Sequence, residues 1–300
     1  MTKALRFLAI CTISVACATL SIASAQIYRQ VDFPGAILTE LAGGPNPEGT
    51  SVGAWQDTGG VVHGFTVTAK GVFQSFDPRG STFTLPAFIS PQGVIVGEYL
   101  DSGSVSHGFI LKGGQYTVVN APGVAGTTLS GISPTGEISG ATCSDPACGN
   151  TGNSNTSHGF VLSKKGKYTF FDPPGATSSS PSTVSPSGSI VGAYTDTVGE
   201  LNHGYLLKNG TYTTIDFPGA LYGTFAGGGN PENDVVGVYN YTASCTADCG
   251  HAFLLRNGVY TWFDYPGASF SEATGINPGG VIVGIFVDSS GGVHGFIRTP

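Results

Sequence analysis

The chain has 300 residues, with 12 basic and 19 acidic side chains and a formal net charge of −7. Charged residues make up 10% of the chain, and glycine is abundant, at 47 residues. An acidic chain without a lysine- and arginine-rich cluster is a poor partner for nucleic acid or an anionic membrane surface, so we expect neither.

Residues 1–25 have the three-part pattern of a signal peptide: a basic start, a mostly apolar stretch and the cleavage motif Ala23-Ser24-Ala25. The alternatives are an uncleaved anchor or a lipid attached at Cys17. We expect cleavage before Gln26 and a secreted, periplasmic or cell-surface protein. Two basic residues leave with the leader, which brings the formal charge to about −9. No later run approaches the ~20 apolar residues of a membrane span, so we expect no membrane insertion after cleavage.

The remaining chain repeats one unit, whose signature is histidine, a small residue and an aromatic residue. Successive signature histidines lie 43 to 51 residues apart, a period typical of solenoids and propellers. Short β-branched and aromatic runs between Gly, Pro, Asn and Ser predict strands rather than helices. The signature histidines are His63, His107, His158, His203, His251 and His294.

Each unit is predicted to hold four short strands, a to d. Examples are 127–132 for a, 190–194 for b, 203–207 for c and 212–216 for d. A Ser/Asn-Pro-x-Gly turn follows strand a, and a turn such as Lys208-Asn209-Gly210 joins c to d. Four antiparallel strands in about 45 residues is the content of one propeller blade.

The two ends of the chain carry complementary parts of the unit. Residues 27–32 match strand d, and residues 294–298 match strand c. Pairing them would close a ring and remove exposed sheet edges, whereas an open solenoid would need atypical capping repeats. We therefore expect residues 26–300 to form one all-β domain. It is predicted to be a six-bladed β-propeller, closed by the N-terminal d strand beside the C-terminal a, b and c strands.

These motifs resemble the HAF-type repeats of bacterial extracellular proteins. The resemblance rests on the turn Gly275-Ile276-Asn277-Pro278-Gly279-Gly280 and on His251-Ala252-Phe253, and it extends over essentially the whole of 26–300. It implies an exported β-repeat protein, and it implies no activity and no catalytic residue.

All the histidines of the chain are repeat histidines. A histidine in every unit is more typical of a structural hydrogen bond between strand c and a nearby loop than of catalysis. The alternative is a ring of imidazoles around a metal ion. We expect no metal site and no cofactor.

Strand d ends in every unit at an Asx residue followed within three residues by glycine, which predicts a turn. The b-to-c connection is the part of the unit that varies most in length, and insertions on one face often mark a binding face. Four shorter b-to-c loops each carry an aspartate, which we interpret as a turn former or as a binding residue for a cation or a sugar hydroxyl. These are Asp57, Asp101, Asp196 and Asp288.

The two longest b-to-c loops carry the four cysteines that remain after leader cleavage. In an exported protein they predict two local disulfides, Cys143–Cys148 and Cys245–Cys249. Pairing between the two loops is the main alternative, and a zinc site is disfavoured because no second Cys or His set accompanies either pair.

Glu40 and Glu272 lie four residues past a corner alanine, near the start of strand a. Ring closure would make their units neighbours, and strand a is predicted to be innermost. Both carboxylates would then approach the mouth of a central channel, where paired carboxylates can share a proton, hold a cation or flank a glycosidic bond. The alternative is two solvated glutamates. The corresponding residues elsewhere are predicted to be Leu85, Thr128, Ser180 and Thr224.

These patterns favour an exported, monomeric binding or scaffold module that recognises an extracellular polysaccharide or protein through its b-to-c loops. The second hypothesis is a glycosidase or polysaccharide lyase that uses Glu40 and Glu272. The third is a purely structural surface protein. The sequence contains no sialidase-type Asp box, G-x-S-x-G elbow or phosphate loop.

Overall fold

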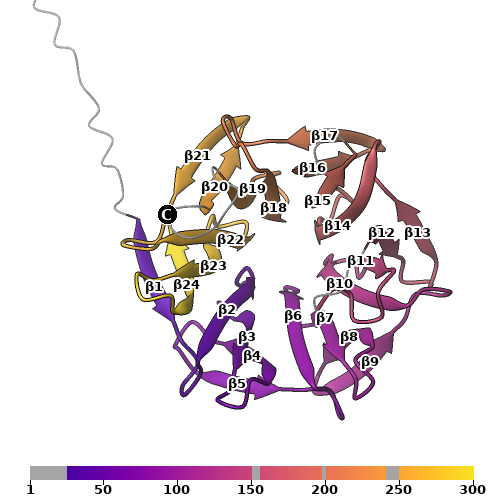
Figure 1. Cartoon of the computed structure of the whole chain (residues 1–300), viewed down its shortest axis with the longest axis horizontal. Helices are drawn as coiled ribbons and strands as arrows, with labels where there is room; N and C mark the ends of the chain where they lie inside the picture. The colour runs from indigo at the N-terminus through magenta and orange to yellow at the C-terminus, as the bar shows by residue number, and fades with distance from the viewer. Residues whose placement is uncertain (1–25, 151–155, 198–200, 241–249) are drawn as a thin grey trace, which may run out of the picture.

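The computed structural model describes residues 26–150, 156–197, 201–240 and 250–300. The predicted signal peptide and the predicted Cys245–Cys249 pair lie outside these ranges. Within them the regular structure is β throughout, and the strands stand around a central axis (Figure 1).

The strands fall into four positions from the axis outward (Figure 1). The inner strands are β2 (Leu38–Gly43), β6 (Phe83–Ile89), β10 (Gly126–Ile132), β14 (Ala176–Val184), β18 (Thr224–Gly229) and β22 (Phe270–Ile276). Next come β3 (Ser51–Gln56), β7 (Ile95–Leu100), β11 (Ile138–Cys143), β15 (Ile190–Asp196), β19 (Val235–Asn240) and β23 (Ile282–Val287). The third position holds β4 (Val62–Val67), β8 (Ser106–Lys112), β12 (Ser157–Leu162), β16 (Asn202–Lys208), β20 (Gly250–Arg256) and β24 (Val293–Thr299). The outer strands are β5 (Phe73–Phe76), β9 (Gln115–Val119), β13 (Tyr168–Phe171), β17 (Thr211–Ile215), β21 (Val259–Phe263) and β1 (Ile27–Val31).

The sheet topology confirms an all-β propeller and corrects one detail of the prediction. Over the described ranges the strands form four four-stranded sheets and one eight-stranded sheet, β2 to β9, instead of one separate sheet per repeat. The two halves of the larger sheet are joined by a parallel bridge between β4 and β6, at Val62 and Phe83. The bridge forms because the corner at 77–82 brings the start of β6 alongside the start of β4.

The N-terminal strand pairs with the C-terminal one, as the complementary ends predict. β1 runs antiparallel to β24 from Ile27↔Thr299 to Val31↔Gly295. The resulting sheet has the order β1-β24-β23-β22. Its outer edge is therefore supplied from the opposite end of the chain.

Every inner strand of the described structure carries a β-bulge at the same register, which the sequence pattern did not predict. A bulge leaves one residue unpaired and turns its side chain away from the ladder. The bulged residues are Ala42, Ala87, Ser130, Ser182, Gly227 and Thr274. They are small and line a common central cavity.

The core lies between adjacent sheets and is built around the aromatic residue of the repeat signature. These rings are fully buried: Phe65, Phe109, Phe160, Tyr205, Phe253 and Phe296. Each packs its edge against a glycine of the neighbouring strand, and the contact repeats from sheet to sheet. The core thus holds the inner strands in place while leaving the axis open.

Candidate functional site

A polar cavity, which we call the funnel, opens at the end of the axis where the b-to-c loops lie. It measures about 610 Å³, and all six bulged residues belong to its lining. Cys143, Cys148 and Ser157 of one b-to-c region line its mouth, which places the funnel at that end. Its wall carries three carboxyl groups, from Glu40, Glu98 and Glu272.

One residue from each inner strand occupies the same register position toward the axis. Each of these residues pairs with a residue of the second strand. That second-strand residue pairs in turn, on its other side, with the glycine or alanine that follows the signature histidine. The set is Glu40, Leu85, Thr128, Ser180, Phe225 and Glu272. The structure therefore brings the two predicted glutamates to one level of one cavity.

The prediction of Thr224 as a member of this set is wrong. Thr224 pairs with Tyr239, and its hydroxyl accepts a hydrogen bond from the backbone N–H of Phe217 at 3.0 Å. Thr39 makes the same contact with Phe33, one residue before Glu40. The chain between the corner and the inner strand is one residue longer in this repeat, so Phe225 takes the axial position.

Glu40 and Glu272 come from neighbouring inner strands, since Thr274 of β22 donates a hydrogen bond to the carbonyl oxygen of Leu41 in β2 at 2.7 Å. Burial and, to a smaller extent, the nearby charge of Glu40 together raise the pKa of Glu272 to about 7. Burial also raises the pKa of Glu40. Among the described residues neither carboxyl group has a hydrogen-bond partner, so both remain available to a molecule in the funnel.

Glu98 is a third carboxyl group of the funnel, and the sequence analysis missed it. It projects from β7, where the equivalent residues of other repeats are apolar, such as Ala54 and Ile285. Burial raises the pKa of Glu98, against hydrogen bonds donated by Ser106 at 2.7 Å and Asn150 at 3.2 Å. A lone charged residue at a position that is apolar in the other repeats was the available signal.

A side groove of about 330 Å³ extends the funnel between β14 and β18. It shares Glu272 with the funnel and adds the rings of Phe225 and Tyr194. Its remaining wall is rich in hydroxyl groups, from Ser178, Ser179, Ser180, Ser182 and Thr195. Carboxylate, hydroxyl and aromatic groups therefore face one continuous space.

The repeat histidines lie outside the funnel and hold the corners of the fold, which confirms their structural interpretation. Nδ1 of each ring lies 2.7–3.0 Å from an oxygen of the Asx residue at the end of an outer strand. The pairs are His63–Asp77, His107–Asn120, His158–Asp172, His203–Asp216, His251–Asp264 and His294–Asp32. The last pair joins the two ends of the chain.

The four loop aspartates contact the other ring nitrogen of these histidines. The Nε2–oxygen distances are 3.5 Å for Asp57, 3.2 Å for Asp101, 3.4 Å for Asp196 and 3.2 Å for Asp288. The second oxygen of Asp57 accepts hydrogen bonds from the backbone of Gly59 and Val61, at 2.8 and 2.9 Å. The turn interpretation accounts for these contacts, and ligand binding through the four aspartates stays a prediction.

The aspartate–histidine contacts also shift the pKa values of His63, His294 and Asp57. Burial opposes a charge on the His63 ring, but hydrogen bonds to Asp77 and Asp57 and their charges outweigh it and raise its pKa. The pKa of His294 is raised in the same way by Asp32 and Asp288. Hydrogen bonds from the Val61 backbone and from His63 lower the pKa of Asp57.

One predicted disulfide is confirmed. Cys143 and Cys148 are bonded, with their Cα atoms 5.2 Å apart. The bonded loop lies at the mouth of the funnel, where Asn150 reaches Glu98. It therefore fixes part of the funnel wall.

Two further features bear on possible ligands. Over the described ranges, no group of three or more His, Cys, Asp or Glu side chains is arranged to hold a metal ion. The same ranges contain no helix of the length and hydropathy needed to cross a membrane.

The fold and its axial cavities place the chain among β-propellers, and solved structures support this. The Aleuria aurantia lectin, described as a six-bladed β-propeller with fucose recognition, is 14% identical over 88% of this chain and 93% of its own, with a TM-score of 0.54. A putative TolB from Agrobacterium tumefaciens is 13% identical over 86% and 89%, with a TM-score of 0.56. The propeller domain of the Trilobed protease from Pyrococcus furiosus, described as having an open velcro topology, is 11% identical over 89% and 94%, with a TM-score of 0.51.

Identities at this level indicate a common fold and nothing more. No protein-family model and no curated protein sequence matches the chain. The resemblance to HAF-type repeats therefore stays a prediction.

Proposed function

We propose that the protein is a ligand-binding β-propeller that recognises a carbohydrate in the funnel and its side groove. The observation that carries the proposal is the set of unused hydrogen-bonding groups at one level of the axis. The carboxyl groups of Glu40 and Glu272 and the hydroxyls of Thr128 and Ser180 face the cavity without partners among the described residues. Polar groups held in this way bind ligands that supply the missing partners.

A sugar matches this wall better than an apolar ligand does. Its hydroxyls can donate to the carboxylates and exchange hydrogen bonds with the serine and threonine side chains. Its C–H face can pack on Phe225, which lies beside Glu272 in the side groove. The cavity of about 610 Å³ is within the size range of small-molecule sites.

A glycan array followed by calorimetry tests this proposal. The Glu272→Gln and Ser180→Ala variants should each weaken the binding of an array hit. At about pH 8.5, where Glu272 with its pKa of about 7 is ionised, the Glu272→Gln effect should be roughly tenfold or more, because a hydrogen bond to a charged group contributes about 1.5–3 kcal/mol. Glu232→Gln, at the opposite end of the axis, is the matched control and should bind like the parent.

An array without hits, or a hit insensitive to both funnel variants, would remove the support for carbohydrate recognition in the funnel. The structural surface protein would then be the better hypothesis.

A second function is favoured by the placement of Glu40 and Glu272 on neighbouring inner strands in one cavity, where burial and the charge of Glu40 raise the pKa of Glu272 to about 7. A carboxyl group that is half protonated near neutral pH can act as a general acid, and Glu40 supplies the second carboxylate of a glycosidase pair. Purified protein would then release reducing sugar from the glycan it binds, with a bell-shaped pH profile. If the protein binds the glycan but releases no reducing sugar from it over the whole range from pH 5 to 8, this function is excluded for that glycan.

We also propose that the eight-stranded sheet consists of two blades, so that the propeller has six blades and a closed ring. Its two halves are each a four-stranded antiparallel unit, linked by the Val62–Phe83 bridge. The pairing of β1 with β24 and the contact of His294 with Asp32 support closure.

A variant lacking 27–33 should lose much of its thermal stability, whereas Ile27→Ala, at an exposed position, should not. An unchanged melting temperature for the deletion would contradict closure.

Export through a cleaved signal peptide is the remaining part of this proposal, and the confirmed disulfide is compatible with it. Mass spectrometry of the protein recovered outside the cytoplasm should find Gln26 at the N-terminus. Recovery with residues 1–25 attached would contradict cleavage.

A further inference from the structure

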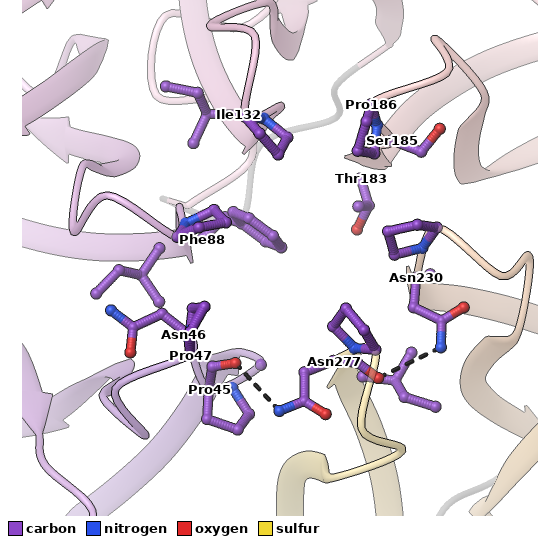
Figure 2. A pocket seen from close by; sticks show the side chains of 18 of the residues that line it. Pro45, Asn46, Pro47, Phe88, Ile132, Thr183, Ser185, Pro186, Asn230 and Asn277 are labelled. Carbon is purple, nitrogen blue, oxygen red and sulfur yellow. Dashed lines mark hydrogen bonds between the residues drawn. The ribbon is translucent and has the colours of Figure 1, made fainter.

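A second cavity lies at the opposite end of the axis, where the turns between the first and second strands of each repeat meet. We call it the proline pocket (Figure 2). Its volume is about 330 Å³. Its rim is formed by one proline from each of these turns: Pro47, Pro91, Pro134, Pro186, Pro231 and Pro278. Its base is formed by Phe88, Ile132, Val184 and Ile276.

The chemistry of this pocket differs from that of the funnel. None of the residues that line it carries an ionisable side chain. Several of its polar side chains are used within and between the turns (Figure 2). Asn277 donates to the Pro45 carbonyl oxygen at 3.4 Å, and Asn230 donates to the Asn277 carbonyl oxygen at 3.3 Å. A charged ligand would therefore lose its hydration there without gaining a partner.

The walls are also held in a fixed shape. Proline fixes φ, and each turn is closed by backbone hydrogen bonds, such as Gly93 to Ser90 at 2.9 Å and Gly136 to Ser133 at 2.9 Å. A preformed apolar cavity of this size loses little entropy when it accepts a small rigid ligand. Proline rings also pack well on aromatic faces, as they do when proline-rich segments bind aromatic-lined grooves.

From these observations we propose that the proline pocket is a binding site for a small uncharged aromatic molecule of one or two rings. The site is distinct from the carbohydrate site proposed for the funnel. The bulged residues of the inner strands line the funnel, and residues further along the same strands line the proline pocket. The two proposals therefore depend on different side chains.

Binding can be measured with 6-propionyl-2-(dimethylamino)naphthalene, an uncharged two-ring dye whose emission changes in apolar surroundings, and with indole as a competitor. Pro134→Glu and Pro134→Lys each place a charge at the rim, at an exposed turn position. Both should weaken dye binding at least tenfold, because an uncharged ligand is disfavoured by desolvation of either charge. Thr135→Glu is the matched control. It places a glutamate where Glu48 and Glu232 stand in other turns, and it should bind the dye like the parent.

Because Pro134→Glu and Pro134→Lys add opposite charges, comparing them distinguishes a site for an uncharged ligand from a site for a charged one. If one variant strengthens binding and the other weakens it, the site selects charge and the proposal is wrong. Equal dye binding by the parent and both charged variants would also overturn it. Pro134→Ala, which keeps the rim apolar, should retain binding and shows whether loss of the proline alone disturbs the turn. Saturable binding of a tryptophan-containing peptide without binding of indole would overturn the proposal in favour of a protein partner.

Discussion

The aromatic residue of the repeat signature is phenylalanine in five repeats and Tyr205 in one. Tyr205 is fully buried, and its hydroxyl has no hydrogen-bond partner among the described residues. Burial raises its pKa well above the ordinary value for tyrosine. The other repeats show that the position is suited to a plain ring.

We therefore predict that Tyr205→Phe stabilises the protein by about 1 kcal/mol, because a buried hydroxyl without a partner costs roughly 1–3 kcal/mol. The free energy of unfolding from urea titration measures this change. The reverse substitution, Phe296→Tyr, is the matched control and should destabilise by a similar amount. A loss of stability in Tyr205→Phe would show that the hydroxyl has a partner such as ordered water.

Of the three carboxyl groups in the funnel, two were predicted from the sequence and one was not. The carboxyl groups of Glu40 and Glu272 were predictable because they depart from the repeat at a position that the fold turns inward. Glu98 departs from the repeat in the same way, but its strand was not expected to face the axis. Whether a side chain reaches the funnel depends on strand twist and bulges, which the alternation of residues does not reveal.

At the scale of the strand, the second strand of every repeat has a glycine as its third residue. These are Gly53, Gly97, Gly140, Gly192, Gly237 and Gly284. A Cβ atom at Gly237 would collide with the carbonyl oxygen of Phe225 and would lie 2.9 Å from the Phe253 ring. The glycine thus permits the close approach of the inner strand and the buried ring.

Gly237→Ala should destabilise the protein by about 3 kcal/mol, because the collision is with backbone that cannot move without shifting the inner strand. Gly103→Ala is the control. Its Cβ would lie 3.3 Å from the exposed carboxyl group of Asp101, so its effect should be below about 0.5 kcal/mol. Thermal unfolding followed by circular dichroism distinguishes the two. Equal melting temperatures for both variants would contradict the packing described here.

The strands and turns themselves were largely predictable. Turn residues with fixed backbone requirements, such as Pro278 and Gly280, separate runs whose length suits a strand. The shift from Thr224 to Phe225 was not predictable, because one added residue in a corner changes which side chain faces the axis and leaves no mark on the hydrophobic pattern. The parallel bridge that merges two sheets depends on how neighbouring repeats pack, and the sequence of one repeat cannot specify it.

At the scale of the whole molecule, stability should decline as the pH rises from about 5 to 8. The pKa values of Glu40, Glu98, Glu272, His63 and His294 are raised in the folded protein. The protonated form of each group is favoured by folding. Its contribution is present below the unfolded pKa and is lost as the pH rises through the folded one.

The pKa shifts of the loop aspartates have the opposite effect on how stability depends on pH. The lowered pKa values of Asp57, Asp101 and Asp288 give stability that is present above about pH 4 and is lost as the pH falls through the folded values. Thermal melts across pH 3 to 8 should therefore show a maximum near about pH 4 to 5. Glu272→Gln should flatten the decline between pH 5 and 8, and a decline as steep as that of the parent would contradict the part assigned to Glu272.

The repeat pattern made the all-β propeller predictable, and the complementary ends of the chain predicted the pairing of β1 with β24. The two axial cavities were not predictable, although every repeat contributes to both. Each cavity is lined by residues from every repeat, such as Ser182 in the funnel and Pro186 in the proline pocket. Such residues have ordinary local roles in a strand or turn, and their combined surface exists only once the repeats are arranged around the axis.

The inner strands bring Glu40 and Glu272 together in one funnel, where burial favours the protonated form of Glu272 near neutral pH. Carboxyl ¹³C NMR titration of the protein, with Glu272 assigned from the Glu272→Gln spectrum, tests this arrangement most directly. We expect Glu272 to titrate with a pKa of about 7 and Glu40→Gln to lower this value. A Glu272 pKa close to 4.5, the ordinary value for a glutamate, that does not change in Glu40→Gln would show that the two carboxyl groups do not interact in a buried site.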